Sequence, residues 1–162
     1  LTFVNPYRDP LGRGYHVIQS TIAVGSGQFF GRGLGHGTQS SLRFLPERHT
    51  DFIFATLAEE LGLFGAGLIL GLYGTLLWRL DILSRQLTAP EDRYYVWGVE
   101  ILLLFQIFVN IGMNMGLVPV TGVTLPLVSY GGSSQISLAI TLGIVHAMSI
   151  SRKELGSQLR IG

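Results

Sequence analysis

The chain has 162 residues, of which 48% are hydrophobic and only 13% are charged, and its formal net charge is +1. Its mean hydropathy of +0.44 implies more apolar surface than a soluble domain of this size can bury, so the composition indicates an integral membrane protein. The absence of cysteine excludes a disulfide framework, a thiolate metal site and a cysteine nucleophile. Because the chain begins with Leu-Thr-Phe and has no signal-peptide pattern, we expect it to be the carboxy-terminal piece of a longer protein.

Residues 1–50 hold many glycines, arginines and turn formers but no apolar run of spanning length, so we expect a large extracytoplasmic loop. Within it, the mildly amphipathic segment from Gly14 to Gly27 predicts a short helix at the membrane interface. Glycines then recur at short intervals from Gly25 to Gly37, without the spacing and the lysine of a phosphate-binding loop. We interpret them as flexible, close-packed loop backbone.

Three apolar segments follow, and each is long enough to cross a hydrocarbon layer of about 30 Å as a helix. The first contains an uncharged run from Leu61 to Trp78, and the second is interrupted only by Glu100 and a few amides. The predicted order is a transmembrane helix over 51–79, a loop over 80–93, a transmembrane helix over 94–118, a loop over 119–133, a transmembrane helix over 134–150 and a tail over 151–162. The expected fold class is therefore an all-α integral membrane protein with a large extracytoplasmic loop before three transmembrane helices.

Basic residues predict the orientation of these helices, because short segments rich in Lys and Arg stay in the cytoplasm. The loop 80–93 and the tail are basic, whereas residues 119–133 contain no Lys or Arg. We therefore expect the first two on the cytoplasmic side, and residues 119–133 outside together with residues 1–50. The arginines of the long external loop then require an anionic partner, which is either lipid headgroups or a substrate that carries pyrophosphate.

The segment FLPERHTDFIF, residues 44–54, runs without a linker into the first span and places charged residues at the membrane boundary. Asp51 lies at the start of the predicted helix, where an acid could cap the helix and gain roughly 0.3–1 kcal/mol from its positive end. A carboxylate there could equally act on a substrate as a base or as a metal ligand. Glu47, Arg48 and His49 either pair within a solvated turn or contact an anionic substrate.

The second span carries a polar stripe made of Gln106, Asn110 and Asn114, at positions i, i+4 and i+8. Such a stripe is expected to face other helices rather than lipid, because amides are costly to expose to hydrocarbon. Hydrogen bonding between helices explains it, and the wall of a substrate cavity is the alternative.

Acidic residues inside the predicted spans have open roles. Glu59 and Glu60 lie about 12–14 Å beyond Asp51 along the helix, too deep to face lipid, so at least one should point into a polar interior. Glu100 lies near the cytoplasmic end of the second span, and we predict that it approaches His146 of the third span.

The loop 119–133 ends in a glycine-serine turn that resembles an anion-binding element. Gly131 and Gly132 permit left-handed backbone, and Ser133 or Ser134 could cap the third span. Backbone amides at that helix start would then form an anion site beside Asp51, although capping alone would also explain the serines.

The segments NPYRDPLGRGYHVIQS, FLPERHTDFIF and NIGMNMGLVPVTGVTLPLVSYGGSS together resemble the SEDS family of bacterial cell-wall polymerases, the RodA and FtsW proteins. The resemblance covers essentially the entire chain, and GYHVIQS and GTQS are more similar to the elongation member, RodA. It implies a multi-pass protein of the bacterial inner membrane with ten helices, of which this chain would hold the last three.

The resemblance also implies a function, the polymerisation of lipid II into glycan strands with release of undecaprenyl pyrophosphate. Expected partners are lipid II, a class B penicillin-binding protein and other membrane proteins of the elongation complex, and no nucleic acid. A lipid II flippase and a membrane scaffold for a penicillin-binding protein are the alternatives. With most helices absent, the isolated fragment is expected to be inactive.

The resemblance assigns the catalytic role to Asp51, either as base or as ligand of a divalent cation, Mg²⁺ or Mn²⁺. The residues that we predict to bind substrate are Glu47, Arg48, His49, Ser129, Gly131, Gly132 and Ser133. Arg43 departs from the family pattern, in which an acid is more common at this position, so no second loop carboxylate is assigned.

Overall fold

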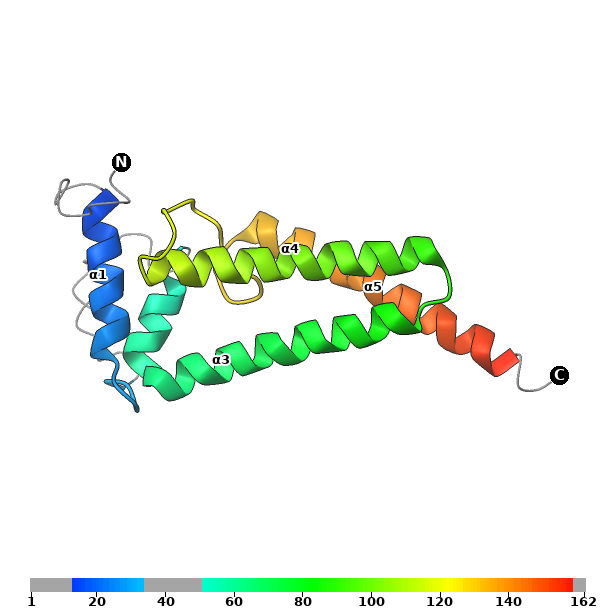
Figure 1. Cartoon of the computed structure of the whole chain (residues 1–162), viewed down its shortest axis with the longest axis horizontal. Coiled ribbons are helices and arrows are strands. Elements are labelled where there is room, and N and C mark those ends of the chain that lie inside the picture. Colours follow the sequence, from blue (N-terminus) through cyan, green and yellow to red (C-terminus); the bar gives the residue numbers. More distant parts are fainter. Residues whose placement is uncertain (1–12, 34–50, 159–162) are drawn as a thin grey trace.

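A computed structural model of the chain describes residues 13–33 and 51–158. Over these residues the regular secondary structure is entirely helical, which confirms the predicted fold class (Figure 1). The helices are α1 (Arg13–Ser26), α3 (Ile53–Gln86), α4 (Pro90–Asn114) and α5 (Gly132–Gln158).

Three of the helices are long and apolar enough to cross a membrane, as predicted: α3, α4 and the part of α5 up to Ile150. Large hydrophobic side chains stay exposed along all three, Leu72, Phe108 and Ile140 among them. In the most apolar part of α5 only 6% of the residues are buried. Lipid or further helices must cover such surfaces, so the fold is that of a multi-pass membrane protein.

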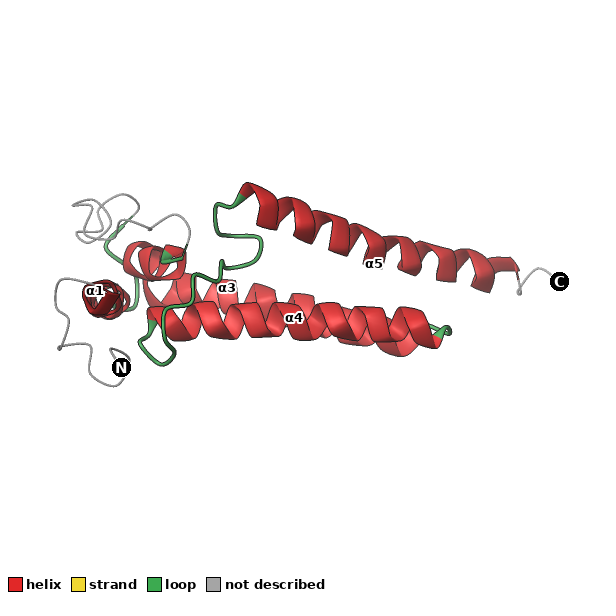
Figure 2. Cartoon of the chain, turned by 90° about the horizontal axis from the view of Figure 1, so that it is seen from above, coloured by secondary structure: helices red, strands yellow, loops and turns green. Residues whose placement is uncertain are grey.

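Helices α3 and α4 run antiparallel and side by side, whereas α5 begins apart from them and comes closer toward its C-terminal end (Figures 1 and 2). There Val145 packs on Leu80 of α3 and on Val96 of α4. Helix α1 lies across the end of this pair and is seen end-on in Figure 2. The predicted loop 80–93 is mostly helical, and only residues 87–89 connect α3 to α4. Helix α3 extends this far because Leu80 packs on Val96 and Val99 of α4, and because Ser84 accepts a hydrogen bond from the Trp97 indole (2.8 Å).

Helix α3 is broken at Gly62, whose backbone angles of φ 67° and ψ −163° are essentially restricted to glycine. In Figure 1 the first turns of α3 stand at an angle to the long remainder. The turn over residues 28–33 fits into the break and satisfies the backbone groups that the break frees. The bonds run from the N–H groups of Leu63 and Phe64 to the carbonyls of Gln28 and Phe29, and from those of Arg32 and Gly33 to the carbonyls of Glu59 and Glu60 (2.8–3.2 Å).

Glycines permit this contact, since a Cβ atom on Gly27 would lie 1.9 Å from the carbonyl oxygen of Ala58, and one on Gly31 would lie 2.1 Å from that of Glu60. The interpretation as close-packed backbone is therefore confirmed for Gly27 and Gly31, whereas Gly25 lies in α1 and a Cβ atom on it would meet nothing within 4 Å. Gly35 and Gly37 lie outside the described residues. The first span, by contrast, is not the continuous helix that we predicted. Glu59, just before the break, has no exposed surface, which confirms that at least one acid of the pair points into the protein.

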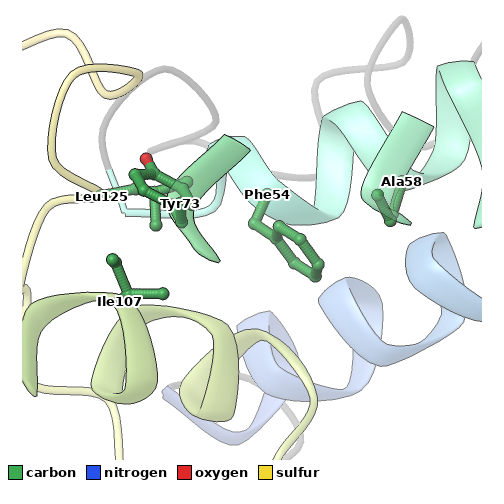
Figure 3. Packing of buried hydrophobic residues seen from close by; sticks show 6 residues of the cluster. Phe54, Ala58, Tyr73, Ile107 and Leu125 are labelled. Carbon is green, nitrogen blue, oxygen red and sulfur yellow. The ribbon is translucent and has the colours of Figure 1, made fainter. Parts of the chain in front are cut away.

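A small core joins the short first part of α3 to the rest of the fold (Figure 3). Phe54 and Ala58 from the short part pack with Tyr73 from the long part, Ile107 from α4 and Leu125 from the α4–α5 connection. The start of α3 is therefore held by three separate elements, and Asp51 stands directly before it.

Candidate active site at the start of helix α3

Asp51 does not cap α3. The N-cap position is occupied by Phe52, whose side chain makes no capping hydrogen bond. The first turn instead receives its capping bond from another helix, because Oδ1 of Asn114 accepts the N–H of Ala55 (3.3 Å). The helix-cap interpretation of Asp51 is thus wrong, since the tertiary contact with α4 supplies what a local cap would have supplied.

Two asparagines of α4 converge on the backbone of Asp51. The Nδ2 atoms of Asn110 and Asn114 each donate to the Asp51 carbonyl oxygen at 3.1 Å. Asn114 also donates to the carbonyl of Asn110 (2.8 Å), and its own carbonyl accepts from the Ser20 hydroxyl of α1 (3.1 Å). Both asparagines are fully buried. The bond between Asn114 and Ala55 of α3 confirms the predicted helix-to-helix hydrogen bonding for Asn114, whereas Asn110 bonds the non-helical backbone of Asp51 and Val123.

The carboxylate of Asp51 lies against the α4–α5 connection. Gly122 has a positive φ of 73°, and a Cβ atom on it would lie 3.6 Å from Oδ2 of Asp51. Asn110 donates to the carbonyl of the next residue, Val123, at 2.7 Å. One side chain therefore holds both the backbone of Asp51 and the loop that faces its carboxylate.

The connection 119–133 is not a simple external hairpin, because it folds back between the helices. The Tyr73 hydroxyl of α3 donates to the carbonyl of Pro126, and Leu125 is almost fully buried. Tyr73 lies eleven residues after Gly62, roughly 16 Å further along α3. Non-helical backbone at such depth occurs in membrane proteins where it is buried in protein or lines a cavity.

Ser129 and Ser134 of the glycine-serine turn line a cavity of 240 Å³ between α4 and α5, and Asp51 is not among the lining residues. Ser129 is buried, and its hydroxyl accepts the N–H of Leu125 (2.8 Å). Because α5 begins at Gly132, the predicted caps Ser133 and Ser134 fall inside the helix. The residue of this connection that lies beside Asp51 is therefore Gly122, which sequence reasoning missed. The only feature of the sequence that could have indicated Gly122 is its place in a Thr-Gly pair, which is typical of a turn.

Gly131 is half-buried, whereas Gly132 and Ser133 are exposed, so these three remain accessible for the predicted substrate contacts. Gln106, the third member of the polar stripe, lines the α4–α5 cavity rather than the surroundings of Asp51.

Glu47, Arg48 and His49 lie outside the described residues, and their substrate roles stay predictions. Within the described ranges no group of three or more His, Asp or Glu side chains gathers that could hold a metal ion. The divalent cation expected at Asp51 stays a prediction.

Glu100 faces α3. The charged groups that act on it are Asp81 and Arg85, which form an ion pair of 3.0 Å one turn apart on α3. His146 is an exposed residue of α5, and the predicted approach of Glu100 to His146 stays a prediction. Val145, the neighbour of His146, packs with Val96 and Val99 of α4, so this part of α5 lies close to α4.

Three long apolar helices, with a half-buried carboxylate where two non-helical connections meet, define a multi-pass membrane protein with a polar site at one end of its spans. The sequence matches the family model of FtsW, RodA and SpoVE cell cycle proteins over residues 1–154. The chain belongs to this family, as its motifs predicted.

Among curated proteins, the chain is 50% identical over 159 residues to peptidoglycan glycosyltransferase MrdB of Escherichia coli K12. This alignment covers 98% of the chain and 43% of MrdB. It is 45% identical over 148 residues to probable peptidoglycan glycosyltransferase FtsW of Halothiobacillus neapolitanus, covering 90% of the chain and 35% of that protein. The chain thus spans less than half the length of these relatives.

Solved structures show the same likeness. A chain from a study of the structural coordination of polymerization and crosslinking by a peptidoglycan synthase complex matches with a TM-score of 0.69 and 45% identity, over 89% of this chain and 38% of its own. A mutant of the rod shape determining protein RodA of Thermus thermophilus matches with a TM-score of 0.58 and 48% identity, over 61% of this chain and 33% of its own.

Proposed function

We propose that this chain is part of a peptidoglycan glycosyltransferase that polymerises lipid II at the outer face of the bacterial inner membrane during cell elongation. The observation that carries the proposal is the placement of Asp51, whose backbone is held by two buried amides and whose carboxylate faces Gly122. The family and the names of the relatives support the reaction class.

In this reaction a sugar hydroxyl of the acceptor attacks the anomeric carbon of the donor, the bond to the lipid pyrophosphate breaks, and the hydroxyl proton leaves. Asp51 is the group proposed to orient the hydroxyl and accept its proton. A carboxylate attached to a fixed backbone is well suited to this task, because catalysis depends on groups that are positioned before the substrate arrives.

A divalent cation, Mg²⁺ or Mn²⁺, is the alternative partner of Asp51. Mg²⁺ is commonly bound by one or two carboxylates together with substrate phosphates, so Asp51 alone suffices on the protein side. Such an ion would neutralise charge on the departing pyrophosphate. Arg48 and His49, which precede Asp51 closely in the sequence, are proposed to bind the same pyrophosphate, with Glu47 as their hydrogen-bonding neighbour.

The proposed partner is a class B penicillin-binding protein, which would cross-link the strands in a complex with other elongation proteins. The structural relative that belongs to a peptidoglycan synthase complex supports this pairing.

The test uses the full-length protein that carries this chain, reconstituted in liposomes with lipid II. Glycan strands in the product establish the polymerase. Transbilayer movement of lipid II without any glycan product would establish a flippase instead, and neither activity in the presence of the bound penicillin-binding protein would favour a scaffold.

A further inference from the structure

The asparagine pair of α4 does more than hold helices together. Asn110 and Asn114 lie one helical turn apart, have no exposed surface, and direct their Nδ2 atoms to the same acceptor, the carbonyl oxygen of Asp51. Association of α3 with α4 requires no such convergence, because bonds to any two carbonyls would serve equally well. We infer that Asn110 and Asn114 are positioning residues that fix the orientation of the Asp51 carboxylate, an inference that rests on the proposed function of Asp51.

The donor inventory shows how completely the start of α3 is held. Each side-chain amide has two N–H groups and one acceptor oxygen. Asn110 uses its Nδ2 on the carbonyls of Asp51 and Val123, at 3.1 and 2.7 Å. Asn114 bonds the Asp51 carbonyl and accepts the N–H of Ala55, at 3.1 and 3.3 Å. The backbone is thus held on both sides of Phe52, and this fixes the direction of the Cα–Cβ bond of Asp51.

The same network sets the distance between Asp51 and the loop that faces it. Asn110 spans from the Asp51 backbone to Val123, and a Cβ atom on the neighbouring Gly122 would lie 3.6 Å from the Asp51 carboxylate. A buried, fully bonded polar network specifies one geometry more strictly than apolar packing does. Loss of one amide is therefore expected to displace the carboxylate relative to the loop while the helices stay packed.

The test introduces Asn110→Asp and Asn114→Asp separately into the full-length protein with lipid II as substrate. Each substitution keeps the side-chain size and removes at least one N–H donor, but it turns a carboxyl oxygen toward buried backbone carbonyls. The folded fraction of each variant is therefore measured first, and kcat is expressed per folded protein. A displacement of the order of 1 Å is expected to lower kcat about 100-fold, with KM for lipid II within about twofold of wild type.

The matched control is Ser84→Ala, which removes a partly buried hydrogen bond of the same helix pair, the one with Trp97, far from Asp51. It should leave kcat unchanged. Wild-type kcat in both asparagine variants would overturn the positioning role. A loss of kcat that is fully explained by a smaller amount of folded protein would overturn it as well, and so would an equal loss of kcat in Ser84→Ala. An active Asp51→Asn variant would contradict the proposed function and the inference with it, whereas an inactive Asp51→Asn with fully active asparagine variants would contradict the inference alone.

Discussion

The backbones of Gly31 and Gly62 are in direct contact: a Cβ atom placed on Gly62 would lie 2.3 Å from the backbone nitrogen of Gly31. This contact turns the first residues of α3 into a separate short helix, bounded by Asp51 at one end and by the break at the other. Its two ends are held by different elements, the turn after α1 and the asparagines of α4.

The glycine contact predicts a strong effect of Gly62→Ala. The substitution adds backbone strain of about 1–3 kcal/mol at a positive φ and forces Gly31 away. We expect a clearly lower melting temperature of the purified protein in detergent. Gly67→Ala is the control, because a Cβ atom at Gly67 meets nothing within 4 Å, and it should be neutral or stabilise by about 0.5–1 kcal/mol. Equal melting temperatures for Gly62→Ala and wild type would refute the role of the break.

Tyr73→Phe should loosen the α4–α5 connection. The change leaves the Pro126 carbonyl without its donor and is expected to cost about 1–3 kcal/mol, because that carbonyl is buried. Hydrogen exchange of residues 119–131 should become faster. Tyr94→Phe, at a residue that is 66% exposed, should leave the exchange unaltered. If both variants exchange like wild type, the connection is held by something other than Tyr73.

The predicted orientation can be tested by cysteine labelling, since the chain contains no cysteine of its own. Thr88 and Thr121 are exposed residues of the α3–α4 and α4–α5 connections. In an otherwise cysteine-free protein, a membrane-impermeant maleimide should label Thr121→Cys in intact spheroplasts and Thr88→Cys only after permeabilisation. The reverse pattern would invert the topology and place Asp51 on the cytoplasmic side.

The 162-residue chain by itself is expected not to polymerise lipid II. Its relatives are more than twice as long, and α5 buries little of its surface within this chain. Purified chain in liposomes should yield no glycan under conditions in which the full-length protein does. Polymer formed by the chain alone would show that the whole site lies within these residues.

Much of this architecture follows from the pattern of residues. Uncharged runs predict the three spans, and the i, i+4 spacing of Asn110 and Asn114 predicts that they face another helix. The break at Gly62 could not be predicted, because Gly62 is one of several glycines in α3 and only its contact with residues 28–33 sets it apart. The hydrogen bond by which Asn114 caps α3 at Ala55 could not be predicted for the same reason, because the residues around Ala55 do not indicate a partner 59 residues away.

The central claim is that the carboxylate of Asp51 carries the chemistry. The most direct measurement compares glycan synthesis from purified lipid II by wild type and by Asp51→Asn, which keeps the side-chain shape and removes its charge and basicity. We predict that Asp51→Asn folds with an unchanged melting temperature, still binds the penicillin-binding protein and forms no detectable glycan strands. Glycan synthesis by Asp51→Asn at the wild-type rate would remove Asp51 from the mechanism.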